Sequence, residues 1–213
     1  MQSLGNSVAI VYDDHLLFAE TFSAVLEKLR LFKSVHIFSD NEQAYRHFLV
    51  KHFDLQVCLF LDYYLPQNNA LVLINETRRI NKKARVIIVS SITTPSIITH
   101  IQTYNPHGFI SKSSGVDIVL DCLRTISQGN RYMCPVIREI APTEPLAADE
   151  IPFTAREIEI LQYFAQGLSV IETANKTHLS KHTVVAHRRK MMRKAQANSI
   201  TELLTYARNK ELI

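Results

Sequence analysis

Several common signatures are missing from this sequence of 213 residues. No apolar run reaches the roughly 18–20 residues that a membrane-spanning helix needs, so we expect no membrane partner. The N-terminus has no basic stretch followed by a long apolar one, which argues against a secretory signal. The three cysteines match no zinc or redox spacing, and there is no phosphate-binding loop of the GxxxxGK type. These absences favour a cytoplasmic protein with reduced thiols.

The charge is distributed unevenly along the chain. Residues 1–150 carry 14 Lys and Arg against 15 Asp and Glu, a net charge of −1, whereas residues 151–213 carry 10 against 5, a net charge of +5. The whole positive excess therefore lies in the last third. A small basic module beside a near-neutral one indicates that the C-terminal part binds a polyanion.

Short apolar runs alternate with amphipathic helical patterns over the first 130 residues. We expect strands at Val8–Tyr12, Ser34–Phe38, Val57–Leu61, Arg85–Ser90 and Gly108–Ile110. We expect helices at Leu16–Leu29, Glu42–Val50, Leu71–Ile80, Ser96–Thr103 and Val116–Ser127. Near-continuous apolar strands are typical of a parallel sheet covered on both faces. Five such repeats predict an α/β fold with a doubly wound five-stranded parallel sheet.

The remaining chain is predicted to be a linker and a small all-α domain. The segment APTEPLAADEIP holds three prolines and little to bury. Three capping boxes then open amphipathic stretches at Thr154, Ser169 and Ser199. We expect a first domain at 1–130, a linker at 131–150 and a four-helix domain at 151–213.

Acidic and polar side chains stand where several predicted strands end. Asp13 and Asp14 follow the first strand, Asp62 follows the third, Ser90 ends the fourth, and Lys112 follows the fifth. With the strand order 2-1-3-4-5, these ends lie at one edge of the sheet, where such folds place their sites. Each residue alone is more often a turn, cap or surface residue, but their conjunction predicts a site.

This site has the composition of a magnesium-assisted phosphoryl acceptor. Clustered carboxylates repel one another unless a cation lies among them, and oxygen ligands suit Mg²⁺. A carboxylate beside a bound cation and a lysine can take a phosphoryl group, because both positive charges stabilise its oxygens. Asp62 is the best nucleophile candidate, Asp14 more than Asp13 is expected to hold the metal, and the Ser90 hydroxyl is expected to bond a phosphoryl oxygen.

The stretches VYDDHLLF, LFLDYYLP, VIIVSS and GFISK resemble the receiver domains of two-component response regulators. The resemblance implies that Asp62 is the phosphoacceptor, Ser90 and Phe109 are the switch residues, and Lys112 binds the phosphoryl group. It also implies that the backbone carbonyl of Tyr64 completes the Mg²⁺ ligands, and that a histidine kinase is the phosphodonor. An aspartate-based phosphatase is disfavoured, since such enzymes usually have a second Asp where Tyr64 stands.

The segment KHTVVAHRRKMMRK, residues 181–194, holds six Lys or Arg, two His and no acid. On a helix, Val184, His187, Met191 and Ala195 form an inward stripe, and the opposite side carries Lys181, Val185, Arg188, Arg189 and Met192. Ser180 caps this helix, but Thr183 stands where a capping box has Glu, which leaves the helix N-terminus free to face phosphate. This layout is typical of a helix that enters the major groove of DNA.

Residues 153–204 resemble the LuxR-type helix-turn-helix domain of the NarL/FixJ subfamily. The resemblance implies a first helix-turn-helix element at Ile171–His178, a reader at Lys181–Ala195 and a dimerisation helix at Ile200–Asn209. The expected contacts with double-stranded DNA come from the reader and are Lys181, Thr183, Val185, Arg188, Arg189 and Lys190. Among them, Arg189 is expected to read bases and Lys190 to contact phosphate or to be a bystander.

Together these patterns predict a transcriptional regulator that is not an enzyme and that forms a homodimer when phosphorylated. One alternative stays open. The receiver could have stopped switching, in which case the chain would bind DNA constitutively or serve as an interaction module.

Overall fold

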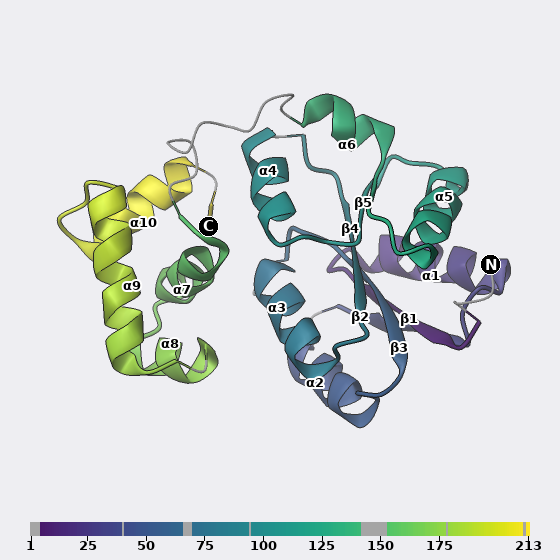
Figure 1. The fold of residues 1–213 in the computed structure, drawn as a ribbon, viewed down its shortest axis with the longest axis horizontal. Helices are drawn as coiled ribbons and strands as arrows, with labels where there is room; N and C mark the ends of the chain where they lie inside the picture. The colour runs from purple at the N-terminus through teal and green to yellow at the C-terminus, as the bar shows by residue number, and fades with distance from the viewer. Residues whose placement is uncertain are drawn as a thin grey trace. The chain divides into compact units, whose positions relative to one another are not determined.

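The computed structural model describes residues 5–39, 41–65, 70–93, 95–141, 153–177, 179–210 and 212–213, without the side chains of Ser96 and Ala155. It contains a unit built on a parallel sheet and a second unit of packed helices (Figure 1). Among the helices of these residues, none has the length and apolar character needed to cross a membrane.

The elements of the first unit follow the predicted alternation closely. Its strands are β1 Ser7–Tyr12, β2 Ser34–Phe38, β3 Gln56–Leu61, β4 Arg85–Ser90, β5 Gly108–Ser111 and β6 Tyr132–Met133. The helices in this stretch of chain are α1 Leu16–Leu29, α2 Glu42–Lys51, α3 Ala70–Ile80, α4 Pro95–Thr103, α5 Val116–Ser127 and α6 Pro135–Ile140. The predicted bounds differ from these by one residue at most.

The sheet has the strand order β2-β1-β3-β4-β5-β6, and every pairing is parallel. The predicted order 2-1-3-4-5 is thus confirmed, but the prediction of five strands is wrong by one. β6 has only two residues, and its pattern is too short to indicate a strand. It is held by the edge of β5, where the Tyr132 N–H donates to His107 O at 2.9 Å and the Cys134 N–H to Phe109 O at 2.9 Å.

Regular structure also occupies the start of the predicted linker. β6 and α6 lie between residues 131 and 141, and Ile137 of α6 is fully buried. Residues 131–141, at the start of the predicted 131–150 linker, therefore belong to the unit that contains the sheet. Residues 142–150 lie outside the described residues.

Helices cover both faces of the sheet. In Figure 1, α1 and α5 lie on one side of the strands, and α2 and α3 lie on the other. The α1–α5 side buries a cluster from alternate strand positions, including Val11, Phe60 and Val89, with Leu26 and Leu123 from the helices. Because neighbouring residues in a strand point to opposite faces, continuously apolar strands place apolar side chains in the cores on both faces of the sheet.

The second unit contains α7 Ala155–Ala165, α8 Val170–Thr177, α9 Lys181–Lys194 and α10 Ile200–Asn209. These helices share a core that includes Ile158, Leu161, Val184, Met191 and Leu203, all fully buried. Val184 and Met191 thereby confirm the inward stripe predicted for residues 181–195. Met192 was expected to point outward, but its flexible side chain is half-buried against this core.

Side-chain caps start these helices as the sequence indicates, with one difference. Thr154 and Glu157 form a reciprocal capping box at α7, and Ser169 and Glu172 do the same at α8. At α10 the Ser199 hydroxyl accepts from the Glu202 N–H at 3.1 Å, but Glu202 accepts from the Asn198 N–H, at 2.7 Å. The Glu202 carboxylate thus binds the N–H of the residue before Ser199, whereas a capping box would have it bind the N–H of Ser199 itself.

Gly108 of β5 marks a close approach between the sheet and α5. A Cβ added there would lie 2.6 Å from Cys122 Sγ. We expect Gly108→Ala to lower the free energy of unfolding by about 1–3 kcal/mol, because a packed core resists an added methyl group. Urea unfolding measures the change. Gly5→Ala is the control, since nothing lies within 4 Å of its added Cβ. If Gly108→Ala lowers the free energy of unfolding as much in a Cys122→Ala background as in the wild type, this explanation is contradicted.

Candidate functional site

The predicted site residues meet at the carboxyl edge of the sheet. The strand pairing continues into the site, since the Asp62 N–H donates to Tyr12 O at 2.9 Å and the Lys112 N–H to Ser90 O at 3.0 Å. Together with the bond from the Asp13 N–H to Phe38 O at 3.1 Å, they fix the main chain directly after β1, β3 and β5. Parallel strands in this order therefore bring together side chains that are far apart in the sequence.

Lys112 is the centre of the charge arrangement. Its Nζ lies 2.8 Å from Asp62 Oδ2 and 2.8 Å from Asp13 Oδ2, and it stands 4.7 Å from the centroid of the Phe18 ring. Both carboxylates are almost completely buried. A single ammonium group thus faces two buried carboxylates, which leaves this buried pair one positive charge short.

The pKa shifts reflect this shortage. Burial raises the pKa of Asp62, and the nearby charge of Asp13 raises it further, while the hydrogen bond from Lys112 acts in the opposite direction. Burial alone would lower the pKa of Lys112, but its hydrogen bonds to Asp13 and Asp62 raise it above the ordinary value. Lys112 therefore stays charged, and Asp62 carries its negative charge at a cost.

Two buried polar atoms beside Asp62 have no hydrogen-bond partner. They are Asp14 Oδ1 and Ser90 Oγ, and Ser90 is fully buried. Buried polar atoms are normally satisfied, so such atoms indicate a place for an ion or a ligand. Within the described residues, one group of acidic or imidazole side chains is compact enough to hold a metal ion, and it consists of Asp13, Asp14, His15 and Asp62.

The other predicted residues of this site occupy different environments. Phe109 is buried in β5, and the Tyr64 side chain is exposed. The sequence prediction did not include His15 or Phe18. His15 follows the acidic pair directly, so its position in the chain was a usable signal, whereas the contact of Phe18 with Lys112 depends on how α1 packs.

The basic residues of α9 divide into two groups. Lys181, Arg189 and Arg193 are exposed, whereas the exposed Lys190 and the half-buried Lys194 both approach Glu157 of α7. Lys194 Nζ lies 2.5 Å from Glu157 Oε2, and Lys190 Nζ lies 3.7 Å from Glu157 Oε1. Glu157 is completely buried. Two of the lysines predicted to contribute to polyanion binding thus lie near a buried carboxylate of the same helical unit.

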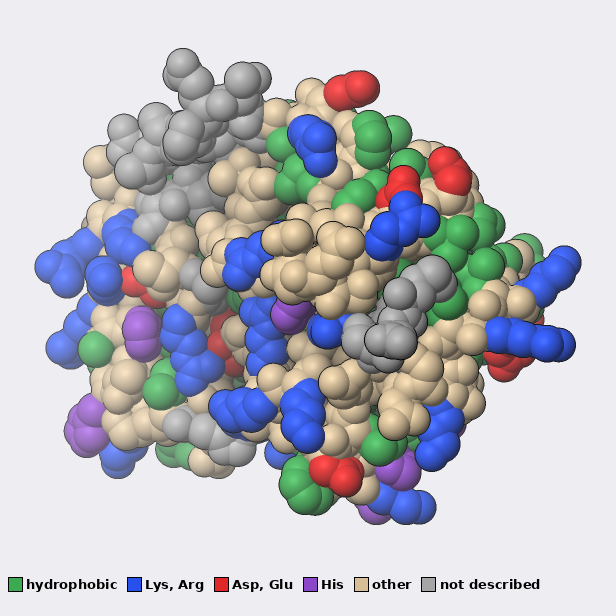
Figure 2. Space-filling view, turned by 45° about the vertical axis from the view of Figure 1, so that its right-hand side comes forward, with side chains coloured by type: hydrophobic (Ala, Val, Ile, Leu, Met, Phe, Trp, Pro, Cys, Tyr) green, Lys and Arg blue, Asp and Glu red, His purple; other side chains and the backbone are tan. Residues whose placement is uncertain are grey.

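Of the other residues predicted to face DNA, Thr183, Val185 and Arg188 are half-buried. Ala186 and Arg193, which the sequence prediction did not place on the outward side of α9, are exposed together with Arg189. These three lie at helical spacing on one face, so a helical wheel centred on the observed core would have included them. The Ser180 hydroxyl accepts from the Thr183 N–H at 3.1 Å, which confirms the predicted cap of α9. On the face drawn in Figure 2, Lys and Arg side chains are more prominent than acidic ones.

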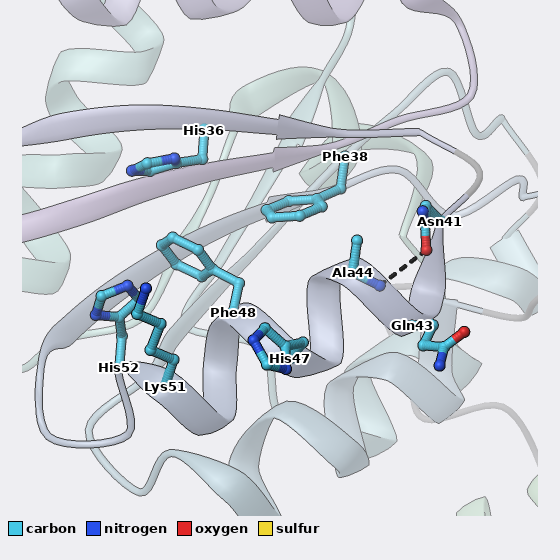
Figure 3. A pocket seen from close by; sticks show the side chains of 9 residues that line it. All are labelled: His36, Phe38, Asn41, Gln43, Ala44, His47, Phe48, Lys51 and His52. Atoms are coloured by element: carbon cyan, nitrogen blue, oxygen red, sulfur yellow. Dashed lines mark hydrogen bonds between the residues drawn. The ribbon is translucent and has the colours of Figure 1, made fainter.

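A separate pocket lies along β2 and α2. Figure 3 shows His36 and Phe38 from the strand opposite His47, Phe48 and His52 at the helix. Burial lowers the pKa of His36, and the charge of His52 adds to this effect. None of the residues that line this pocket belongs to the acidic site.

Comparisons with known families assign both parts of the chain. Residues 8–124 match the response regulator receiver domain, which is more than half of the sequence. The chain belongs to the response regulators. Residues 152–207 match the bacterial regulatory proteins of the luxR family, so the regulator is of the NarL/FixJ type.

Similar proteins cover nearly the whole response regulator. The Fimbriae Z protein of Salmonella typhimurium is 25% identical over 96% of this chain and 97% of its own length. The oxygen regulatory protein NreC of Staphylococcus epidermidis is 26% identical over 96% of this chain and 98% of its own. A structure of RcsB from Salmonella enterica serovar Typhimurium, bound to promoter rprA with BeF3−, has a TM-score of 0.64 at 21% identity and covers 94% of this chain and 98% of that one.

The buried ion pair of the response regulator's luxR-type domain gives a testable stability effect. Lys194→Met should lower the free energy of unfolding by about 2 kcal/mol at pH 7, because Glu157 loses a charged hydrogen bond in a buried position. Arg193→Met is the matched control, since it removes an exposed charge from the same helix. Thermal unfolding and hydrogen exchange of the α7 and α9 amides measure the difference.

The effect should depend on pH in a defined direction. Burial alone would raise the pKa of Glu157, but the bonds from Lys194 and from the Thr154 N–H bring it below its ordinary value of 4.5. The ionised carboxylate therefore stabilises the fold fully above pH 4.5, and this stabilisation is lost as the pH falls through the folded-state pKa. A Lys194→Met deficit that is the same at pH 7 and in strong acid would contradict the assignment.

Proposed function

We propose that this response regulator accepts a phosphoryl group on Asp62 from a histidine kinase and thereby controls the binding of its luxR-type domain to double-stranded DNA. The observation that carries the proposal is the geometry around Asp62. A buried carboxylate lies 2.8 Å from Lys112 Nζ, beside a buried Ser90 hydroxyl that makes no hydrogen bond. Lys112 is placed to bind phosphoryl oxygens while the Asp62 carboxylate attacks phosphorus.

The residues present fit a magnesium ion. Asp13, Asp14 and Asp62 supply carboxylate oxygens, Asp14 Oδ1 has no hydrogen bond to lose, and the Tyr64 carbonyl is the fourth proposed protein ligand. When bound, Mg²⁺ would supply the positive charge that the site lacks and would neutralise the incoming phosphoryl oxygens.

Ser90 and Phe109 are the proposed switch. A phosphoryl oxygen on Asp62 would give the unpaired Ser90 hydroxyl an acceptor, and its movement would free space for Phe109, which is fully buried in this structure. Such a rearrangement changes the surface beside β5 and makes dimerisation dependent on phosphorylation. We propose α10 as the dimerisation helix of the luxR-type domain and a homodimer as the active form.

The proposed DNA contacts are on α9 and are Lys181, Thr183, Val185, Arg188, Arg189 and Lys190. The exposure of Arg189 supports its role as the base reader. The position of Lys190 near Glu157 makes it the weakest member of the set. RcsB, whose fold this chain shares, has been seen in complexes with DNA, which supports the same use of the domain here.

For the domain organisation, we propose that the receiver extends from residue 1 beyond 130 to the end of α6, and that the luxR-type domain occupies 151–213. The protein is proposed to work in the cytoplasm as a regulator, not as an enzyme. Absence of any phosphoryl transfer would favour the second candidate, a receiver that no longer switches.

Asp62→Asn tests the phosphoacceptor. The variant should fold and gain no phosphoryl group from acetyl phosphate and Mg²⁺, because an amide cannot attack phosphorus in this way. Its stability at neutral pH should not fall, since a carboxylate with a raised pKa opposes folding once it is ionised. Mass spectrometry reads the transfer, and Asp54→Asn, in an exposed position, is the control. Full phosphorylation of Asp62→Asn would identify a different acceptor.

Arg189→Ala and Lys190→Ala test the DNA interface. On a duplex selected from a random-sequence pool, Arg189→Ala should cost ~1–3 kcal/mol of binding free energy and much less on a scrambled duplex. Lys190→Ala should change both affinities little, because Glu157 already lies near its ammonium group. Titrations over a salt series measure both effects. Equal proportional losses on the two duplexes for Arg189→Ala would make it a phosphate contact.

A further inference from the structure

The pocket between β2 and α2 is lined by a row of aromatic rings. His36 and Phe38 of the strand lie opposite Phe48 and His52 at the helix, and the pocket has a volume of about 640 Å³ (Figure 3). The ring centroid of Phe48 is 4.6 Å from that of His36, 4.6 Å from that of His52 and 5.7 Å from that of Phe38. The volume is in the range of about 300–1,000 Å³ that small-molecule sites have.

These four rings are not enclosed as a folded core encloses its side chains. Each of them is half-buried, whereas Tyr45 of the same helix is fully buried and packs against Phe38 with 5.5 Å between the ring centroids. Folding therefore uses the Tyr45 side of this aromatic cluster and leaves the other side open to solvent. An aromatic surface that stays partly exposed and lines a pocket is typical of a ligand-binding groove.

The three histidines of the pocket do not form a metal site. Within the described residues, the group of side chains compact enough to bind one ion is the acidic site, and it contains none of His36, His47 and His52. Nε2 of His36 is 2.9 Å from Ser34 Oγ, and burial lowers the pKa of this imidazole, so that it presents a neutral planar ring at pH 7. His36 is therefore an aromatic wall of the pocket.

The charge at the pocket has one sign. Among the described residues that line it, none is acidic, and Lys51 supplies an ammonium group at the end of α2. Lys51 is exposed and takes no part in the ion pairs of the described residues. A ligand therefore meets flat apolar walls and one unpaired positive charge, which matches a monoanion better than a dianion such as phosphate.

We propose that the β2–α2 pocket binds a small planar aromatic carboxylate. The ring of the ligand packs on Phe48 and the neighbouring imidazoles, and its carboxylate pairs with Lys51. Offset and edge-to-face contacts between rings favour such a ligand over a branched aliphatic acid of the same volume. The pocket shares none of its lining residues with the acidic site, so this inference goes beyond the proposed function and does not depend on it.

Nuclear magnetic resonance of the isotope-labelled full-length protein tests the pocket with cinnamate, a planar aromatic carboxylate. The amide signals of β2 and α2 should shift and saturate with a dissociation constant that is roughly millimolar or tighter, which is the affinity range that so small a ligand can reach. Cinnamide has the same shape and no charge. It should shift the same signals and bind about two- to fivefold more weakly, because an exposed ion pair contributes little.

Two variants separate the contribution of the charge from that of the rings. Lys51→Met should weaken cinnamate binding by about two- to fivefold and leave cinnamide binding unchanged. Lys28→Met is the matched control, because Lys28 is an exposed lysine of α1, on the other side of the sheet (Figure 1). Phe48→Leu should weaken the binding of both ligands by about two- to tenfold, because the ring contacts are lost. If thermal unfolding shows that Phe48→Leu does not fold, the two lysine variants decide the question.

Three results would overturn the inference. One is the absence of shifts in β2 and α2 at millimolar cinnamate. Another is cinnamate binding that Lys51→Met weakens no more than Lys28→Met does. The third is a shift of the same amide signals on dilution without any ligand, which would show that a second copy of the chain covers the pocket. None of these results concerns phosphorylation of Asp62, so the proposed function would stand in each case.

Discussion

The sharing of one ammonium group by two buried carboxylates is the constraint on which the receiver site depends. Lys112 lies 2.8 Å from both Asp13 and Asp62, and no second cation of the described residues lies that close to either carboxylate. Removing carboxylates from water is costly unless their charge is compensated, so the folded chain retains an electrostatic imbalance at this edge of the sheet. The raised pKa of Asp62 is the direct expression of that imbalance. Backbone pairing of the neighbouring strands supports this arrangement, because it prevents the two acids from moving apart.

The luxR-type domain has the opposite charge balance, with an excess of positive charge on one helix. Its α9 concentrates positive charge, and two of the lysines turn toward α7, where a completely buried Glu157 accepts from Lys194. The same glutamate accepts from the Thr154 N–H at the start of α7, so one carboxylate both begins a helix and anchors the reader to it. The lysines that stabilise the domain are therefore distinct from the exposed arginines, whose guanidinium groups stay available to a partner. Stability and the proposed recognition of DNA thus depend on different side chains of one helix.

The sequence predicts elements well and side-chain partners less well, for physical reasons. Apolar runs and cap residues are local signals, and they placed the helices and strands of the first five repeats within one residue. β6 was not predicted, since two residues carry no periodicity and depend on the edge of β5. The convergence of Asp13, Asp62 and Lys112 followed from the strand order, because main-chain pairing determines where these positions meet. The partner of Lys190 did not follow from a helical wheel, because a long flexible side chain reaches across to whichever helix carries the acid.

Metal binding and phosphorylation act on the same imbalance in different ways. A divalent ion among Asp13, Asp14 and Asp62 would add the missing positive charge, whereas a phosphoryl group on Asp62 would add negative charge and acceptor oxygens close to Lys112 and Ser90. The two events are therefore linked, because each makes the other more favourable by charge compensation. In the proposed switch, a phosphoryl oxygen would give the Ser90 hydroxyl an acceptor that it lacks in this structure, and the hydroxyl would move toward the site. The proposed role of the buried hydroxyl is therefore to convert a change of charge at the carboxyl ends of the strands into a change of packing around Phe109, which is buried in this structure.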